Sequence, residues 1–193
     1  MKLILASSSP RRAEILRNAG FHFEVVAAHV DESRRPGEAP ADYVRRVAAS
    51  KARGAVRSVE GSAIVIGADT VVVVGGSVLG KPASAADARE TLRRLSGRGH
   101  DVLSGLALIR LPDRFERIVE ETTGVTFAPL STEEIEDYIS TGEPFGKAGA
   151  YAIQGRAGRF VTRVDGDYFN VMGLPLPRLY TILRELGWSA DLG

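Results

Sequence analysis

The sequence contains no cysteine. This absence excludes disulfides, iron–sulfur clusters, thiolate metal sites and a cysteine nucleophile, and it suits a reducing compartment. An excess of one charge is also lacking, because 25 Lys and Arg side chains stand against 24 Asp and Glu, for a net charge of +1. A nucleic-acid polymer is therefore not the expected partner, although this balance is compatible with a local basic pocket.

Long apolar runs are missing as well. The first one, residues 3–6, is shorter than the core of about 7–15 residues that a secretion signal requires. No stretch approaches the roughly 18 apolar residues of a membrane span. We therefore expect a cytoplasmic protein with no membrane partner. The length of 193 residues, with 44% hydrophobic and 25% charged residues, predicts one globular domain over 1–193, or two lobes that share a core.

Several sequence motifs of nucleotide binding and hydrolysis are absent too. The chain has no Gly-x-x-x-x-Gly-Lys-Ser/Thr phosphate loop, dinucleotide fingerprint, Gly-x-Ser-x-Gly elbow or His-Glu-x-x-His pair. Its three histidines show no metal-ligand spacing. Any hydrolytic chemistry must therefore be carried by a different set of residues.

Hydrophobic periodicity predicts strands alternating with helices in the first half of the chain and hairpins in the middle. The expected strands are 3–6, 21–26, 63–66, 71–74, 78–79, 101–109, 115–127, 151–154 and 160–164. The expected helices are 10–19, 41–59, 85–95, 132–142 and 176–186, with 31–40 an exposed loop. Such a pattern favours a mixed-sheet α/β protein.

A first candidate site lies in residues 7–12, which read Ser-Ser-Ser-Pro-Arg-Arg between a strand and a helix. Ser9 suits the N-cap and Pro10 the first helical position, so the first amides of the helix point into the loop. These amides, with the hydroxyls and the guanidiniums of Arg11 and Arg12, are typical of an anion site. The alternative is a well-capped helix whose arginines are solvated.

Two charged residues fall on apolar patterns. Lys51 lies on the buried stripe of the 41–59 helix, where a lysine either extends to solvent or meets a buried anion. Asp69 follows the apolar strand 63–66, and strand ends in α/β proteins border ligand crevices. A carboxylate there needs a metal, a cation or amides as its partner; the alternative is that it only caps the turn.

Other charges lie in predicted loops and would ordinarily be solvated. They are Asp31, Glu32, Lys81, Glu143, Lys147 and Arg156. Taken together, however, the bases Arg11, Arg12, Lys51 and Lys81 and the acids Glu32 and Asp69 resemble a phosphate-and-metal site. Magnesium binds one or two carboxylates together with substrate phosphate oxygens. The residues leave open which phosphate bond would break.

Ordered motifs along nearly the whole chain resemble those of the Maf family of nucleoside triphosphate pyrophosphatases. They are Leu5-Ala6-Ser7-Ser8-Ser9-Pro10-Arg11-Arg12, Asp31-Glu32, Ser50-Lys51-Ala52, Gly67-Ala68-Asp69-Thr70, Gly80-Lys81-Pro82, Lys147 through Gly155, and Tyr168 through Leu176. The resemblance implies an elongated, two-lobed mixed α/β fold with a central cleft, related to inosine triphosphate pyrophosphatases. It also implies a homodimer.

The resemblance further implies cleavage at the α-phosphorus with Mg²⁺ or Mn²⁺, held by Asp69 and Glu32. The products would be a nucleoside monophosphate and pyrophosphate, and clearance of non-standard nucleotides is a further implied role. Asp69 matches the proton acceptor of the family, and Lys51 and Lys81 would act with it on the phosphates. Ser7, Ser9, Arg11 and Arg12, with Thr70 and Gln154, complete the implied substrate-binding set.

Three of these positions bear on the nucleobase. In the Maf family, the positions of Arg12, Thr70 and Gln154 separate members that hydrolyse dTTP and UTP from members that prefer 7-methyl-GTP. Pro-Arg-Arg, Gly-Ala-Asp-Thr and Ile-Gln-Gly in this chain resemble the first group. We therefore expect dTTP and UTP as substrates.

Two other functions use the same residues. A non-catalytic, nucleotide-binding regulator of cell division and septum formation would need the same basic pocket, and a phosphatase would remove only the terminal phosphate. Asp69 favours an enzyme, because a protein that only binds anions gains nothing from a carboxylate facing phosphate without a metal.

Overall fold

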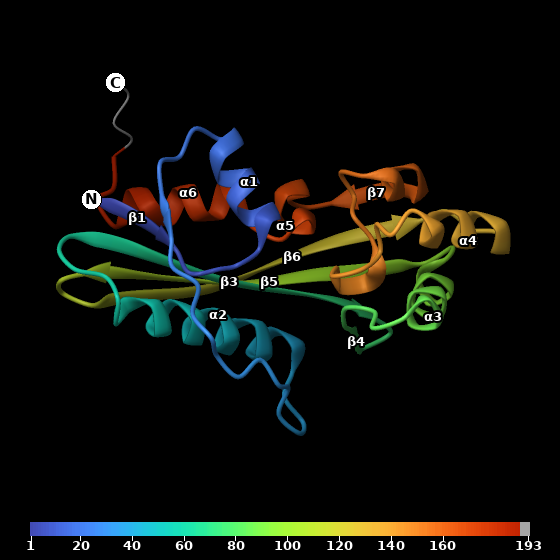
Figure 1. The fold of residues 1–193 in the computed structure, drawn as a ribbon, viewed down its shortest axis with the longest axis horizontal. Helices are drawn as coiled ribbons and strands as arrows, with labels where there is room; N and C mark the ends of the chain where they lie inside the picture. The colour runs from blue at the N-terminus through green and yellow to red at the C-terminus, as the bar shows by residue number, and fades with distance from the viewer. Residues whose placement is uncertain (190–193) are drawn as a thin grey trace. The chain divides into compact units, whose positions relative to one another are not determined.

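The computed structural model describes residues 1–189 and has a mixed α/β fold built on a seven-stranded sheet (Figure 1). The strands are β1 (Lys2–Leu5), β2 (Glu24–Val25), β3 (Ala63–Val74), β4 (Ser77–Leu79), β5 (Gly99–Leu111), β6 (Phe115–Phe127) and β7 (Val161–Asp165). Their order is β2-β1-β3-β5-β6-β7, and β4 pairs with β3. This confirms the predicted mixed sheet.

Six α-helices and two short 3₁₀ helices occur in the described residues. The α-helices are α1 (Pro10–Asn18), α2 (Pro40–Val56), α3 (Ala85–Leu95), α4 (Thr132–Ser140), α5 (Tyr168–Met172) and α6 (Leu176–Glu185). The 3₁₀ helices are η1 (Ala148–Ala150) and η2 (Arg156–Phe160). Within residues 1–189, no helix combines the length and the apolar character that crossing a membrane requires.

The chain divides into two compact units. The first unit comprises Met1–Asp69, Ser104–Glu121 and the chain from Gly173 onward; the second comprises Thr70–Leu103 and Thr122–Met172. Strands β3, β5 and β6 each contribute residues to both units. On β3 the boundary falls between Asp69 and Thr70, so two predicted site residues that are neighbours in sequence belong to different units.

In the first unit, helices α2 and α6 lie on opposite sides of the strands (Figure 1). Helix α2 approaches the sheet closely because glycines face it. A β-carbon at Gly67 on β3 would lie 2.2 Å from the Ala48 carbonyl oxygen, and one at Gly105 on β5 would lie 2.1 Å from that of Val44. Side chains two residues apart share a face of a strand. The face of β3 that carries Gly67 therefore also turns Asp69 toward α2.

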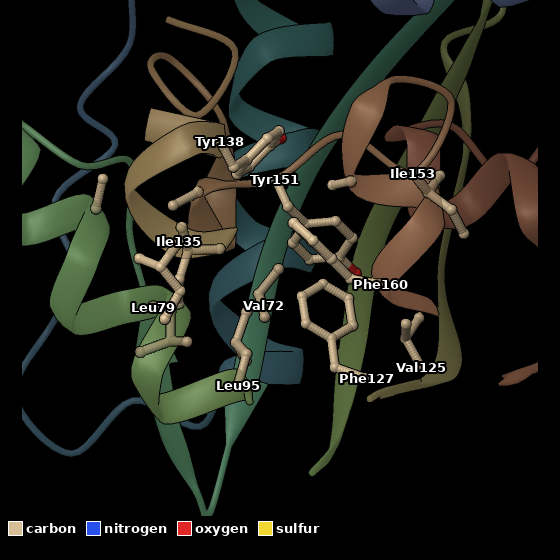
Figure 2. Close-up of a cluster of buried hydrophobic side chains, with 14 of the residues drawn as sticks. Val72, Leu79, Leu95, Val125, Phe127, Ile135, Tyr138, Tyr151, Ile153 and Phe160 are labelled. Carbon is tan, nitrogen blue, oxygen red and sulfur yellow. The ribbon is translucent and has the colours of Figure 1, made fainter. Parts of the chain in front are cut away.

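In the second unit, α3 packs against α4, and apolar side chains form one buried cluster (Figure 2). Phe127 packs edge-on against Tyr151, with ring centroids 4.9 Å apart. His100 is buried, and its Nε2 lies 2.9 Å from the Tyr151 hydroxyl. Burial lowers the pKa of His100 to about 4, so the ring is neutral at pH 7. The ring of this histidine packs edge-on against both Phe127 and Tyr151.

Local signals predicted several boundaries correctly. Ser131 and Glu134 form the expected capping box of α4, and Ser84 accepts a hydrogen bond from the Asp87 amide at the start of α3. The hairpin of β3 and β4 turns at Gly75 and Gly76 as predicted, with Val74 paired to Ser77. Helix α2, however, ends at Val56 rather than at residue 59, and β2 has only two residues.

Two predicted elements were wrong in ways that matter for the site. Strand β3 does not end at residue 66 but continues through Asp69 to Val74. Gly67 breaks the apolar pattern there because α2 leaves no room for a side chain. Residues 151–154 are not a strand; the Ala152 carbonyl accepts a hydrogen bond from the Gly155 amide at 3.0 Å, which closes a turn.

Candidate active site

The turn between β1 and α1 is organised by Ser7. Ser9 is the N-cap and Pro10 begins the helix, as predicted, but the Ser9 side chain makes no capping hydrogen bond within residues 1–189. The buried Ser7 hydroxyl instead accepts a hydrogen bond from the Ser9 amide at 3.2 Å. The first turn of α1 is therefore held from the strand side, and Arg11 within this turn is half-buried.

Arg12 is buried and binds the protein itself. Its Nε donates to the Gly173 carbonyl at 2.7 Å, and its Nη1 donates to the Ala68 carbonyl at 2.8 Å and to the Ser7 hydroxyl at 3.1 Å. Burial lowers the pKa of this guanidinium, and the negative charge of Asp69 opposes that effect. Arg12 thus joins the start of α1, the middle of β3 and the segment before α6. Its predicted contact with phosphate or nucleobase stays a prediction.

Lys51 and Asp69 form a buried ion pair, and Glu32 joins it. The Lys51 ammonium lies 2.8 Å from Asp69 Oδ1 and 3.1 Å from Glu32 Oε1. The side chains of Lys51 and Asp69 are each 10% exposed, whereas that of Glu32 is 47% exposed. Of the alternatives left open by the sequence, Lys51 therefore meets a buried anion rather than extending to solvent. The partner of Asp69 is thus a cationic side chain, and the carboxylates of Asp69 and Glu32 converge on the Lys51 ammonium.

Glu32 is positioned by a loop that is fastened to α2. The Tyr43 hydroxyl donates to the Glu32 carbonyl at 2.9 Å. Arg46 donates to the Ser33 carbonyl at 2.9 Å and to Glu38 Oε1 at 2.6 Å. The hydrogen bond from Arg46 lowers the pKa of Glu38 to about 2. The loop is exposed as predicted, but these contacts fix its path, so Glu32 reaches Lys51 from a defined direction.

Tyr43 was missed by sequence reasoning. Burial raises its pKa to about 12, and the negative charges of Asp69 and Glu32 add to the effect, so the hydroxyl stays protonated next to the acidic pair. A signal was available, because Tyr43, Val47 and Lys51 recur at intervals of four residues on α2. Side chains at this spacing share one helix face.

The remaining predicted site residues belong to the second unit. Thr70 is half-buried on β3, and Lys81 and Gln154 are exposed. Lys81 lies between β4 and α3, where the Gly80 carbonyl accepts a hydrogen bond from the Gly149 amide at 3.2 Å. This bond joins two of the sequence motifs, Gly80-Lys81-Pro82 and the stretch from Lys147 to Gly155.

The donor set for a divalent cation consists of two carboxylates. No group of three or more His, Asp or Glu side chains in residues 1–189 is arranged to hold a metal ion. Glu32 and Asp69 nevertheless converge on one cationic atom, the Lys51 ammonium. Two carboxylates fit Mg²⁺ when substrate phosphate oxygens and water complete the shell, since Mg²⁺ is rarely enclosed by protein ligands alone.

Fold and site together define an α/β protein with a buried cluster of acids and bases suited to phosphate and cation chemistry. Residues 2–186 match the sequence model of a family described as Maf-like protein, and the chain belongs to this family.

Relatives in this family match the chain almost from end to end. A protein of Symbiobacterium thermophilum named dTTP/UTP pyrophosphatase is 52% identical, over 100% of this chain and 97% of its own. A protein of the same name from Koribacter versatilis is also 52% identical, over 97% of this chain and 95% of its own.

Among solved structures, the fold resembles that of the Staphylococcus aureus Ham1 protein. The two align over 96% of this chain and 100% of the other, with a TM-score of 0.54 and 14% identity. At this identity the likeness concerns the fold alone. It agrees with the mixed α/β fold class expected from the sequence.

The contacts of Arg12 generate a stability prediction. Arg12→Lys keeps the charge, but an ammonium cannot reproduce the planar fork that reaches two carbonyls and a hydroxyl at once. We expect the free energy of unfolding to fall by about 1.5–3 kcal/mol, measured by urea denaturation. The exposed Arg57, changed to Lys, serves as the control and should change stability by less than about 0.5 kcal/mol. Equal stability of Arg12→Lys and the parent would contradict the bridging role.

Proposed function

We propose that this protein hydrolyses dTTP and UTP to the nucleoside monophosphate and pyrophosphate, and that the whole chain acts as one nucleotide pyrophosphatase domain. The observation that carries the proposal is the buried pair of Lys51 and Asp69, joined by Glu32. Relatives about half identical over the full chain bear the name of this activity, which favours the enzyme over the non-catalytic regulator.

Asp69 is the proposed proton acceptor. Its carboxylate takes a proton from a water molecule whose oxygen forms a bond to the α-phosphorus, while the bond to the bridging oxygen breaks and pyrophosphate leaves. Lys51, 2.8 Å from Asp69, holds that carboxylate in one orientation and offsets negative charge gathered on the phosphates. Burial of the pair strengthens both effects, because little water competes for either group.

Asp69 and Glu32 are the proposed ligands of Mg²⁺ or Mn²⁺. When bound, the cation would supply charge neutralisation for the triphosphate and orientation of the attacking water. The fastening of the Glu32 loop by Tyr43 and Arg46 keeps the second carboxylate near the first. Lys51 remains the cationic side chain that contacts both Asp69 and Glu32.

Phosphate binding is assigned to the remaining polar groups by resemblance to the family. Ser7, Ser9 and Arg11 lie at the N-terminus of α1, where amides and positive charge favour anions. Lys81, which is exposed in the second unit, is proposed as a further phosphate contact. Arg12 holds the turn between β1 and α1, which carries Ser7, Ser9 and Arg11, by donating to the Ser7 hydroxyl and the Ala68 carbonyl.

Base selection is assigned to Gln154, with Thr70 and Arg12. A glutamine amide donates to a carbonyl and accepts from a ring N–H, and uracil and thymine present both on one edge. A carboxylate only accepts, so it would suit the donor-rich edge of a methylated guanine instead. Gln154 is exposed, which leaves its amide accessible to a ligand.

The proposed setting follows from the proposed substrates. Free nucleoside triphosphates are cytoplasmic metabolites, so the cytoplasm is the proposed location, and removal of non-standard nucleotides is a compatible role. A homodimer is proposed from the family resemblance. The nucleotide is the proposed partner, and the near-zero net charge of +1 argues against a nucleic-acid polymer.

The first prediction concerns Asp69. Asp69→Asn should fold, as judged by circular dichroism, and should lose at least about 10²-fold in kcat for dTTP, roughly 3 kcal/mol, because the proton acceptor is gone. Asp101→Asn, at an exposed position, is the matched control and should keep parental turnover. Near-parental turnover of Asp69→Asn would refute the assignment.

A second prediction concerns the cation and the bond that breaks. With dTTP, the parent enzyme should form dTMP and pyrophosphate only when Mg²⁺ or Mn²⁺ is present, because the two carboxylates are anions like the triphosphate and a cation must lie between them. EDTA should abolish turnover, and added metal should restore it. Chromatography of the products separates the candidates: dTDP would indicate a phosphatase, no product with tight binding would indicate a regulator, and full activity in EDTA would exclude the cation.

A third prediction concerns the base. The parent should cleave dTTP and UTP about ten- to hundredfold better than CTP, ATP and 7-methyl-GTP, measured as kcat/KM, since an unpaired polar edge costs about 1–3 kcal/mol. Gln154→Glu should lower turnover of both pyrimidine substrates without unfolding the protein. Ser77→Glu adds the same charge at an exposed position of β4 and should have no such effect. A preference of the parent for 7-methyl-GTP would show that these three positions were misassigned.

A further inference from the structure

We infer that Tyr138 and Glu143 are positioning residues for Gln154, and that they govern discrimination between nucleobases without touching the base. The inference rests on the proposed function, because it takes Gln154 as the residue that contacts the base. The sequence offered Glu143 only as an ordinary loop charge. All the groups concerned belong to the second unit.

Tyr138 reaches from α4 to the segment just before Gln154. Its side chain is fully buried, and its ring packs edge-on against Phe160, at 5.4 Å between centroids (Figure 2). The hydroxyl donates to Glu143 Oε1 at 2.8 Å and accepts from the Ala152 amide at 3.2 Å. A rigid ring in the core thus fixes the backbone two residues before Gln154.

Glu143 fixes the backbone on the other side of Gln154. Its Oε2 accepts from the Arg156 amide at 3.1 Å, and its Oε1 accepts from the Ala157 amide at 3.4 Å, at the start of η2. Burial raises the pKa of Glu143, but the hydrogen bonds from the Arg156 amide and the Tyr138 hydroxyl outweigh it, and the net pKa is lowered. The group is therefore a carboxylate at neutral pH, able to accept from several donors at once.

The turn between these two anchors has no spare room. The Gly155 amide donates to the Ala152 carbonyl at 3.0 Å, which places Ile153 and Gln154 at the corners of the turn. Ile153 is buried and Gln154 is exposed. A β-carbon at Gly155 would lie 2.5 Å from both carboxylate oxygens of Glu143, so only glycine lets the carboxylate come this close.

These contacts have a consequence for recognition. The Gln154 amide can pair with a base edge that presents a carbonyl and an N–H only when it lies in the right place and direction, and a misplacement of about 1 Å is enough to impair a functional site. An exposed glutamine on an unanchored loop could reorient its amide to pair with either kind of base edge. Anchors at residues 152 and 156–157 restrict the backbone from which this side chain projects, so their loss should affect base selection more than the chemical step.

The test compares kcat and KM for dTTP and CTP in the parent and in Glu143→Gln, Tyr138→Phe, Gln154→Ala and the double variant Glu143→Gln/Gln154→Ala. We expect Glu143→Gln and Tyr138→Phe each to lower the dTTP-to-CTP ratio of kcat/KM by about three- to tenfold, as expected for one or two lost hydrogen bonds. The change should lie mainly in KM for dTTP, with kcat within about twofold of the parent.

The double variant separates positioning from an independent effect. If Glu143 acts through Gln154, then Glu143→Gln should change the ratio no further once Gln154 is alanine. Two controls lie on α4, the helix that carries Tyr138. Asp137→Asn removes one exposed charge from α4, and Ile135→Val slightly loosens its buried face. Both controls should keep the parental ratio, with thermal midpoints recorded for every variant.

Each other result overturns the inference. A parental ratio in Glu143→Gln and Tyr138→Phe, beside a lowered ratio in Gln154→Ala, would refute positioning and leave the proposed function intact. Additive effects in the double variant, or a lowered ratio in Ile135→Val, would show an independent or merely structural role. A parental ratio in Gln154→Ala would refute the base contact itself, and the inference with it. If Glu143→Gln does not fold, Tyr138→Phe decides by the same criteria.

Discussion

The ion pair of Lys51 and Asp69 depends on the absence of side chains at two other positions. Gly67 and Gly105 let the backbone of α2 lie directly on β3 and β5, closer than any β-carbon would allow. At that separation a lysine on α2 and an aspartate on β3 meet at 2.8 Å while both are nearly buried. A buried charge without a partner costs several kcal/mol, so the packing and the pair require each other. Tyr43 and Arg46 on the same helix hold the loop that carries Glu32, so the second carboxylate also depends on the placement of α2.

Much of the fold could be predicted because its signals are local. Ser84 and Ser131 cap helices through bonds to residues three positions on, and the Gly75-Gly76 turn forces a hairpin. Lys51 could be placed on the buried face of a helix from periodicity alone. In each case the physical cause lies within a few residues of its effect, so one sequence contains it.

The rest depends on contacts between distant residues. Arg12 binds the Gly173 carbonyl, 161 positions away, and no local pattern near residues 7–12 indicates that partner. The predicted end of β3 at residue 66 was wrong because Gly67 resembles a strand break in sequence, whereas it accommodates a helix in space. Tyr138 and Glu143 went unrecognised for the same reason: their partners, the amides of residues 152, 156 and 157, are backbone groups that carry no mark in the sequence.

The continuity of β3 has a bearing on how substrate preference can change over evolutionary time. Successive side chains on a strand point to opposite faces, so Asp69, which faces α2, and its neighbour Thr70 project in opposite directions. Because the two side chains lie on opposite faces of the strand, a new residue in place of the threonine does not project from the face that carries the aspartate. A lineage can therefore sample new residues at position 70 without altering the face of β3 that carries Asp69, the proposed proton acceptor.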